Sequence, residues 1–374
     1  MKKVLLTATV QSHIAQFHVP LIRMLKENDY EVHVAARNNL TEKSGLTLNT
    51  PDKIFNIPFD RFPLSKNNIV AYKQLLELIN KNNYDVIHCN TPMGGVLTRL
   101  AARKARKKGT KVYYTAHGFH FYKGAPVKNW FFYFPIEKYL AKYTDKLITI
   151  TKEDYRLSSK KFKTRTHYTH GVGVNPNKYF KIPEDEKAKL RKELGLSENS
   201  FVMLCTGELN GNKNQKTVIK AFAEVVKVNS KMLLLLAGNG PMEHELKDLV
   251  NGLGVSNNVT FLGYRTDLEK FVNVSDIVIS ASHREGLPLN IMEAMLCEKP
   301  VVASINRGHK ELVQDGITGF LVQSNDFIGF AKNILNLSNN DKLINSLGNA
   351  GYKAVEPFIA DNVVDELKQI YEVK

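Results

Sequence analysis

The chain has 374 residues, of which 43% are hydrophobic and 24% are charged, a composition that predicts a soluble globular protein and excludes disorder. Its length suffices for two ordinary domains, and no apolar run reaches the roughly 18–20 residues of a membrane-spanning helix. The net charge of +15 is unevenly placed, since residues 1–172 hold 29 Lys and Arg against 12 Asp and Glu, whereas the remainder holds 23 against 25. The basic first half indicates a polyanionic partner, either a nucleic acid or an anionic membrane surface.

Residues 1–10 combine a basic start with a short apolar run, which fits either a secretory leader or a first buried strand. Polar residues such as His13 arrive before any small-residue cleavage site, so we favour the strand. The cysteines predict neither a disulfide framework nor a zinc site, because Cys89, Cys205 and Cys297 are odd in number and far apart. We therefore expect a cytoplasmic protein with reduced, buried thiols.

Short apolar or β-branched runs alternate with longer amphipathic stretches along the whole chain. In the first half, the predicted strands are 4–10, 31–36, 86–89, 111–115 and 147–151, and the predicted helices are 18–27, 72–81 and 95–107. In the second half, the strands are 201–207, 231–238, 259–262, 277–280, 300–303 and 319–322, and the helices include 215–228 and 244–253. This alternation is typical of parallel sheets covered by helices.

A polar connector over residues 175–200 separates the two sets of elements. We predict an α/β protein with two Rossmann-like domains, 1–174 and 175–357, whose parallel sheets face a central cleft. A final helix within 358–374 is expected to return to the first domain. In such sheets ligands bind beyond the carboxyl ends of the strands, where backbone N–H groups and helix starts converge.

The segment SASHREGLPLNIMEAML, residues 280–296, carries most of the chemical information. A predicted strand leads into a loop with Gly286 and then into a helix predicted over 290–297. The exposed N–H groups of such a helix start favour a phosphate. Glu285 in the loop and Glu293, expected in the first helical turn, can each accept hydrogen bonds from sugar hydroxyls. As isolated residues they would more often be a turn residue and a helix-start residue.

This segment resembles the E-x7-E signature of glycosyltransferase family 4, whose members are retaining enzymes of the two-domain GT-B fold. The match includes EGLP at 285–288 and EAM at 293–295, and it continues through PVVA at 300–303 and DGITGFLV at 315–322. The resemblance implies that Glu293 binds the nucleotide ribose and that Glu285 is a catalytic residue on the donor sugar. It also implies that the backbone amides of Gly286 and Leu287 bind the diphosphate.

A second phosphate-facing edge is predicted where the strand 201–207 ends. Gly207 and Lys213 fit the family pattern, with Lys213 offering a point charge to the diphosphate. Glu208, however, stands where the family usually has an arginine. Another cation is then needed for the phosphate clamp, and Arg265 and Arg284 are the candidates.

Two further turns follow strands of the second half. The resemblance places Asn239 beside the nucleotide, and it places Tyr264 and Arg265 near the base. A purely structural turn explains either sequence nearly as well.

His117 follows a predicted strand of the first half, and the resemblance implies a catalytic role in positioning the donor sugar. His120, three residues later, is more simply a core histidine. The loop after the first strand lacks the paired glycines common in the family, and we expect Ser12 and His13 to contact the acceptor instead. Phe119 is a third candidate for acceptor binding.

Basic residues of the first half cluster in two places. One predicted helix carries Arg99, Arg103, Arg106 and Lys107. The segment KNWFFYF at 128–134 mixes a cation with aromatics, which suits a lipid headgroup region. Stacking on single-stranded nucleic acid or ordinary core packing would explain the same composition.

The motifs of competing classes are missing, since the chain has no GxGxxG after a first strand, no GK[ST] and no DxD. The sequence most resembles bacterial transferases of capsule and exopolysaccharide assembly. That resemblance implies transfer of a hexose or N-acetylhexosamine, with UDP the expected nucleotide, to a polyprenyl-diphosphate saccharide. We expect no metal and no other cofactor, no nucleic-acid partner, and a peripheral position on the inner face of the membrane. A sugar-nucleotide epimerase and a nucleic-acid-binding protein that reuses the fold are the alternatives.

Overall fold

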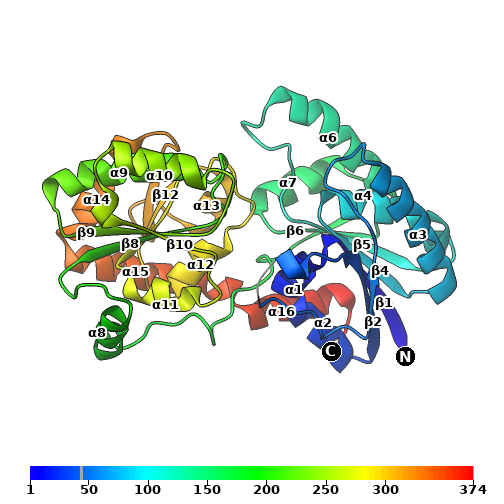
Figure 1. Ribbon diagram of the computed structural model, residues 1–374. Coiled ribbons are helices and arrows are strands. Elements are labelled where there is room, and N and C mark those ends of the chain that lie inside the picture. The colour runs from blue at the N-terminus through cyan, green and yellow to red at the C-terminus, as the bar shows by residue number, and fades with distance from the viewer. Residues whose placement is uncertain (43–44, 374) are drawn as a thin grey trace. The chain divides into compact units, whose positions relative to one another are not determined.

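Each half of the chain builds one parallel sheet, because its apolar strands are connected through helices (Figure 1). The computed structural model describes residues 1–42 and 45–373. Within it, unit 1 comprises Met1–Gly173 and Ala360–Lys374, and unit 2 comprises Val174–Ile359.

Unit 1 contains a seven-stranded sheet with the order β3-β2-β1-β4-β5-β6-β7. Its strands are β1 (Lys2–Val10), β2 (Tyr30–Arg37), β3 (Lys53–Asn56), β4 (Val86–Asn90), β5 (Lys111–Ala116), β6 (Lys146–Thr149) and β7 (Arg165–Tyr168). Its α-helices are α1 (Gln11–Phe17), α2 (Val19–Glu27), α3 (Lys66–Asn82), α4 (Pro92–Ala101), α5 (Arg103–Lys107), α6 (Val127–Leu140), α7 (Lys152–Lys161) and α16 (Ala360–Tyr371). The strand order reverses between β1 and β4.

Unit 2 contains a six-stranded sheet with the order β10-β9-β8-β11-β12-β13. Its strands are β8 (Phe201–Thr206), β9 (Met232–Ala237), β10 (Val259–Gly263), β11 (Ile277–Ser280), β12 (Val301–Ser304) and β13 (Gly319–Val322). Its α-helices are α8 (Glu184–Glu193), α9 (Gln215–Val228), α10 (Glu243–Gly252), α11 (Leu268–Val274), α12 (Leu289–Leu296), α13 (Arg307–Leu312), α14 (Phe327–Ser338) and α15 (Asp341–Val355). Here the order reverses between β8 and β11.

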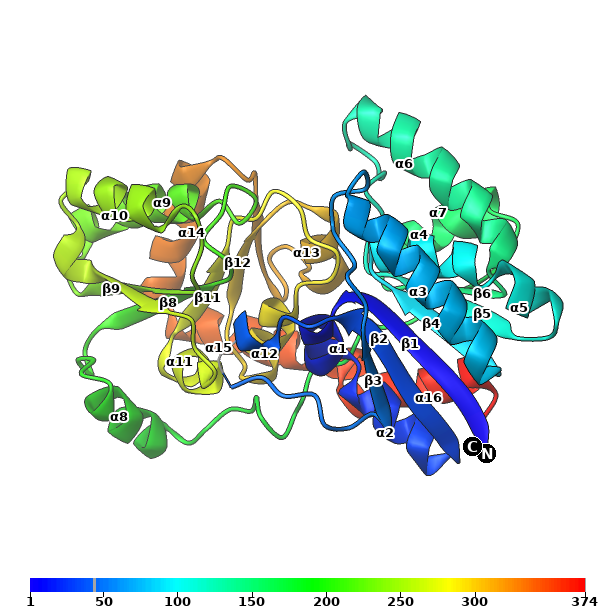
Figure 2. The same ribbon diagram turned by 45° about the vertical axis from the view of Figure 1, so that its right-hand side comes forward.

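The central strands are apolar on both faces, because helices cover both sides of each sheet. In β1, Leu6 packs against α1, α2 and α16, whereas Leu5 packs against α3 and α4 on the opposite face. Figure 2 shows these two groups of helices on either side of the unit 1 sheet. In unit 2, α9 and α14 cover one face and α12 covers the other. Helices therefore cover both faces of each sheet, and a polar ligand can reach the sheet only at the ends of its strands.

The terminal helix α16 belongs to unit 1 and is held there by polar contacts as well as by its apolar face. The hydroxyl of Tyr371 lies 2.7 Å from Nδ1 of the buried His88. The backbone N–H of His170 donates to the Glu366 carboxylate over 2.9 Å. Lys146 bonds the carbonyl of Ile370 and the carboxylate of Glu372. Both ends of the chain are thus part of one sheet-and-helix unit.

Several predicted element boundaries differ from the observed ones, including those of the helix predicted over 72–81, which begins at Lys66 and ends at Asn82. A short helix, α1, precedes α2. The helical conformation is interrupted at His18, and α2 begins at the next residue, Val19. The predicted helix 95–107 is divided at Ala102 into α4 and α5. The connector 175–200 contains the helix α8, whose acidic first turn and basic last turn complement the helix dipole. The three cysteines are buried and unpaired, as predicted.

The sequence grouped Arg99 with the other basic residues of one predicted helix. The structure shows that it is not part of a solvent-facing cluster, because its side chain is buried in unit 1. Its guanidinium lies 2.9 Å from the Glu137 carboxylate of α6 and 3.8 Å from the ring centroid of Tyr114. Arg106 is also paired, with Asp145 at 2.9 Å. Among the described residues, no helix combines the length and apolar character needed to cross a membrane.

Removing one partner of the Arg99–Glu137 pair should destabilise unit 1. We expect Glu137→Ala to lower the free energy of unfolding by about 3–5 kcal/mol, because it leaves a buried guanidinium without its counter-charge. Trp130, the single tryptophan, lies in unit 1 and reports its urea unfolding by fluorescence. The exposed Lys104→Ala is the control, expected to stay within about 0.5 kcal/mol of the parent protein. Equal stability of both variants would contradict the structural role of the pair.

Candidate active site

Two loops of unit 2 meet at the point where the strand order reverses. One follows β8 and leads to α9, and the other follows β11 and leads to α12. The backbone N–H of His283 donates to the carbonyl of Asn212 over 2.8 Å, and the Asn212 amide donates to the carbonyl of Arg284 over 3.0 Å. These bonds fix the loops against each other at the carboxyl edge of the sheet, where ligands of such folds bind.

An ion pair between Lys213 and Glu285 connects the same two loops. Their Nζ and Oε1 atoms lie 2.7 Å apart, and both side chains are mostly shielded from solvent. The Lys213 stem also covers Gly207, where an added Cβ would come within 3.2 Å of the Lys213 Cε atom. Gly207 has φ of +139°, a conformation that favours glycine. The structure therefore brings Gly207, Lys213 and Glu285 together, and an anion arriving here would compete with Glu285 for the lysine.

Glu293 lies in the second turn of α12, because the helix begins at Leu289. The expectation of a first-turn position is therefore wrong. Burial raises the pKa of Glu293 from 4.5 to about 7, partly opposed by a hydrogen bond from the Tyr179 hydroxyl and by the charge of Lys178. Tyr179 comes from the connector before α8, and nothing in its local sequence signals this contact. A carboxyl group with a strongly shifted pKa, close to the loops that follow the strands, is a candidate for ligand binding.

The predicted diphosphate amides lie in the loop that joins β11 to α12. The backbone N–H groups of Gly286 and Leu287 make no hydrogen bond among the residues that the structure describes, and both residues are only partly buried. Gly308, the second residue of α13, approaches this loop closely, since an added Cβ would lie 2.6 Å from the Gly286 carbonyl oxygen. The two N–H groups therefore remain open to an acceptor atom of a ligand.

Asn239 lies in a tight turn after β9 and is exposed. The turn needs its glycines, because a Cβ on Gly238 would fall 2.0 Å from the Gly207 carbonyl oxygen. The Asn239 carbonyl accepts from the N–H of Leu209 over 3.0 Å. Asn239 and Gly207 therefore lie in contacting turns that follow the neighbouring strands β9 and β8.

The two cations considered for the phosphate clamp differ in their partners. Arg265 makes two hydrogen bonds to the Asp267 carboxylate, of 2.8 and 2.7 Å, so its charge is already compensated. Arg284 is exposed in the loop before Glu285. Tyr264, beside Arg265, is also exposed. Of the two cations, Arg284 is the one not committed to a carboxylate within the described ranges.

His309 was missed by the sequence analysis although it lies beside the Glu285 loop. Its side chain is fully buried, Nδ1 lies 2.7 Å from the Ser304 carbonyl oxygen, and Nε2 has no hydrogen-bond partner in the described structure. Burial lowers the pKa of His309, so the ring is neutral. Its place directly after Gly308 within the family-like segment was the available signal.

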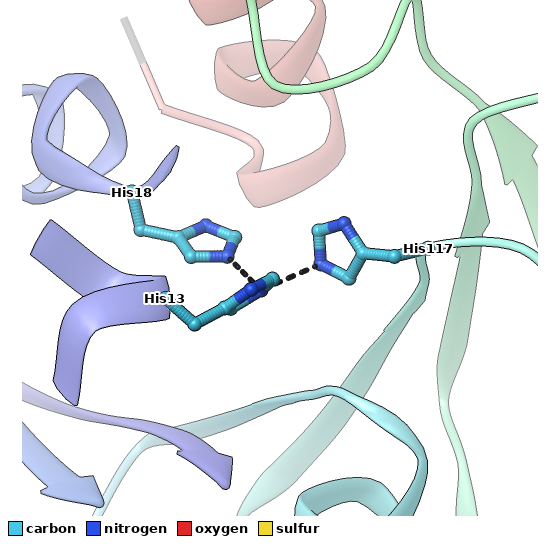
Figure 3. Close-up of side chains that lie close together, drawn as sticks. All are labelled: His13, His18 and His117. Atoms are coloured by element: carbon cyan, nitrogen blue, oxygen red, sulfur yellow. Dashed lines mark hydrogen bonds between the residues drawn. The ribbon is translucent and has the colours of Figure 1, made fainter. Parts of the chain in front are cut away.

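Three histidines from different segments lie close together near the carboxyl ends of the strands of the unit 1 sheet. His117 follows β5, His13 lies on α1, and His18 lies between α1 and α2. Figure 3 shows the ring of His13 between the other two. Nε2 of His13 lies 3.3 Å from Nε2 of His117 and 3.3 Å from Nε2 of His18. The contact between His13 and His18 is local in sequence, but their contact with His117 arises only through the fold.

These histidines are neutral near pH 7. Burial lowers the pKa of His117 to about 4. Burial also lowers the pKa of His13, as do the charges of His117 and Arg61. The pKa of His18 is lowered for the same reason, burial first and the other histidines second. His117 Nε2 also lies 3.1 Å from Oδ1 of Asn90, at the end of β4.

The other acceptor candidates of unit 1 are less accessible. Ser12 is buried and exchanges two hydrogen bonds with Asn39, of 3.0 and 2.9 Å. The Phe119 ring is stacked on Phe121 in the core, and the expected acceptor-binding role does not fit this burial. His120 is only half-buried and stacks on Tyr133, so it is not a core histidine.

Comparisons with known proteins agree with this architecture. The family model "Glycosyl transferases group 1" matches residues 186–354, and "Glycosyl transferase 4-like" matches residues 3–151. The chain is 43% identical over 373 residues to the putative glycosyltransferase EpsD of Bacillus subtilis, covering 99% of this chain and 96% of that protein. It is 29% identical to the UDP-Gal:alpha-D-GlcNAc-diphosphoundecaprenol alpha-1,3-galactosyltransferase of Escherichia coli, over 79% of this chain and 77% of that protein.

Solved structures share the whole fold. Anabaena Alr3699/HepE in complex with UDP and glucose matches with a TM-score of 0.79 at 23% identity, over the full length of both chains. Sucrose-phosphate synthase from Thermosynechococcus elongatus matches with a TM-score of 0.81 at 19% identity, over 100% of this chain and 98% of that one. The predicted GT-B fold class is confirmed.

The raised pKa of Glu293 makes stability depend on pH. Between pH 4.5 and 7 the folded protein holds a proton on Glu293 that the unfolded chain releases, so this carboxyl destabilises the fold as the pH rises through that window. Glu293→Gln stays neutral. We expect its unfolding free energy to rise relative to the parent protein from pH 4.5 to 7, by on the order of 3 kcal/mol.

Urea unfolding followed by circular dichroism across this pH series measures the effect. The exposed Glu186 on α8 provides the control substitution, Glu186→Gln, which should show no such trend. A difference between Glu293→Gln and the parent protein that does not change with pH would mean that Glu293 ionises normally.

Proposed function

Because this chain belongs to the group 1 glycosyltransferases, with a glycosyltransferase 4-like N-terminal segment, we propose that it moves a sugar from a UDP-sugar to a lipid-linked diphosphate saccharide with retention of configuration. The observation that carries the donor half of this proposal is the cluster of Lys213, Glu285 and Gly207 at the strand-order reversal of unit 2. Exopolysaccharide or capsule assembly is the setting that we propose from the sequence resemblance.

In this proposal each group at the unit 2 edge has one task. Glu293 accepts hydrogen bonds from the ribose hydroxyls, and Glu285 does so from the donor sugar. The free N–H groups of Gly286 and Leu287 bind the diphosphate. Lys213 breaks its ion pair with Glu285 and binds the diphosphate instead. The E. coli relative's name specifies a UDP-sugar donor, and Anabaena HepE was solved with UDP, which supports UDP as the nucleotide.

The phosphate clamp needs a second cation because Glu208 stands at the usual arginine position. We assign this task to Arg284, since Arg265 is held by Asp267. The guanidinium can bond phosphate oxygens in pairs. As the bond between the sugar and the diphosphate breaks, negative charge grows on the departing phosphate oxygen, and Lys213 and Arg284 stabilise it.

Retention follows from attack on the same face of the sugar that the diphosphate leaves. The acceptor hydroxyl oxygen forms the new bond to the anomeric carbon, and the old bond to the phosphate oxygen breaks. The hydroxyl proton passes to the departing diphosphate, so no side chain has to act as base. His117, neutral because burial lowers its pKa to about 4, is suited to hydrogen-bond a sugar hydroxyl.

The lipid-linked acceptor is supported by the E. coli relative, whose name specifies a diphosphoundecaprenol substrate. Helix α6 provides a surface that fits a bilayer. Its side chains of Val127, Phe131 and Phe132 are 84%, 74% and 62% exposed, and Lys128 and Lys138 are exposed beside them. Exposed aromatics flanked by cations bind the headgroup region of anionic membranes. We propose that α6 docks this protein peripherally on such a membrane.

The donor site is tested by screening UDP-sugars for hydrolysis and transfer. With the active donor, Lys213→Ala and Glu285→Ala should each lower kcat/KM by about 10²–10³-fold, because each removes a group that meets developing charge or the sugar. Lys216→Ala is the matched control, since Lys216 lies three residues after Lys213, in the first turn of α9, but pairs with Glu245 at the surface. Full activity of Glu285→Ala and Glu293→Ala would overturn the site assignment. An epimerised free nucleotide sugar formed without acceptor would indicate an epimerase instead.

The membrane surface is tested by flotation with vesicles containing anionic lipid. We expect the double substitution F131S/F132S to weaken binding at least about 10-fold, because two exposed aromatic side chains lose their burial in the bilayer. Phe180→Ser, at an exposed phenylalanine of unit 2, is the control. Added salt should weaken binding of the parent protein. Binding to DNA in gel shifts, with no vesicle binding and no donor hydrolysis, would overturn the proposal.

A further inference from the structure

The three histidines at the unit 1 edge have the spacing of ligands around one metal ion (Figure 3). Two of the three Nε2 pairs are 3.3 Å apart, and one nitrogen of each ring lies within 4.8 Å of the others. With metal–nitrogen bonds of 2.0–2.1 Å, two ligands of a tetrahedral site are about 3.3–3.4 Å apart. The two observed pairs match that edge length.

Against the expectation of no metal, we propose that His13, His18 and His117 form a binding site for a divalent transition metal, with Zn²⁺ the best match. Among the described residues, this is the set of side chains able to hold a metal ion. Imidazole nitrogens suit Zn²⁺, Cu²⁺ and Ni²⁺, whereas Mg²⁺ and Ca²⁺ prefer oxygen ligands, of which this set has none. The site therefore differs from the Mg²⁺ or Mn²⁺ sites that hold a nucleotide diphosphate.

The surroundings keep the three rings available as ligands. His18 is 5% exposed, and the other two are half-buried, so the cluster is shielded but remains reachable. His88 lies nearby, but its two nitrogens bond Tyr371 and Thr115 and do not compete.

Three protein ligands leave one tetrahedral position open, which is the arrangement of zinc sites that bind a further ligand. Asn90 is a protein candidate for that position, since its Oδ1 lies 3.1 Å from His117 Nε2. Resting on the proposed function, an acceptor phosphate oxygen is the ligand that this edge would receive instead. Metal binding itself does not depend on that assignment.

The test uses the full-length chain without an affinity tag, stripped with chelator and titrated with Zn²⁺ and with Co²⁺ alone. We expect one ion per chain and, with Co²⁺, the visible absorption of four-coordinate cobalt. His13→Ala and His117→Ala should each weaken Zn²⁺ binding by at least about 100-fold. The control, His244→Ala, changes an exposed histidine of α10 and should bind as the parent protein does.

Less than stoichiometric binding by the parent protein would overturn the metal site, whatever the folding of the variants. Unchanged binding in His13→Ala would overturn it as well, because the ion would then lie elsewhere. These titrations contain no sugar nucleotide. Failure of the metal site is therefore distinguishable from failure of the glycosyltransferase assignment, which the Lys213 and Glu285 variants test separately.

Discussion

The parallel direction of all strands within each sheet is the constraint on which both candidate sites depend. A parallel strand that is buried on both faces can be apolar along its length. Polar functional side chains are therefore not found on the faces of such a sheet. Each strand must then be followed by a loop at the same edge. In unit 2 this gathers Lys213 and Glu285 from loops 72 residues apart. In unit 1 it gathers His13, on the helix that follows β1, and His117, which follows β5, 104 residues apart in sequence.

The two edges hold their polar groups by different electrostatic means. At the unit 2 edge, Lys213 and Glu285 compensate each other, so a ligand anion has to exchange partners rather than meet a bare charge. Glu293 avoids an unpaired buried charge by holding its proton more tightly. The unit 1 histidines avoid charge altogether by remaining neutral. Both arrangements keep polar groups available to a ligand at a lower desolvation cost than permanent buried charges would impose.

The sequence predicted the sheets well because their signal is local. Periodicity located most strands to within one or two residues, and the segment around Glu285 identified the fold family. Contacts that depend on tertiary structure could not be predicted. Tyr179 reaches Glu293 from a polar connector, and His117 meets His13 across 104 residues of sequence. Nothing within a window of ten residues specifies either contact, and burial of a ring such as Phe119 depends equally on distant packing.

The same distinction applies to charge, where a count along the chain overstates the field at the surface. The basic excess of the first half includes Arg99, which is buried against Glu137, and Arg106, which is paired with Asp145. Such compensated cations contribute little to the potential outside the protein. The surface that remains positive carries exposed lysines, and on α6 these lie beside exposed aromatic side chains. A helix that buries a carboxylate while exposing rings and lysines supports the proposed membrane docking over a purely electrostatic partner.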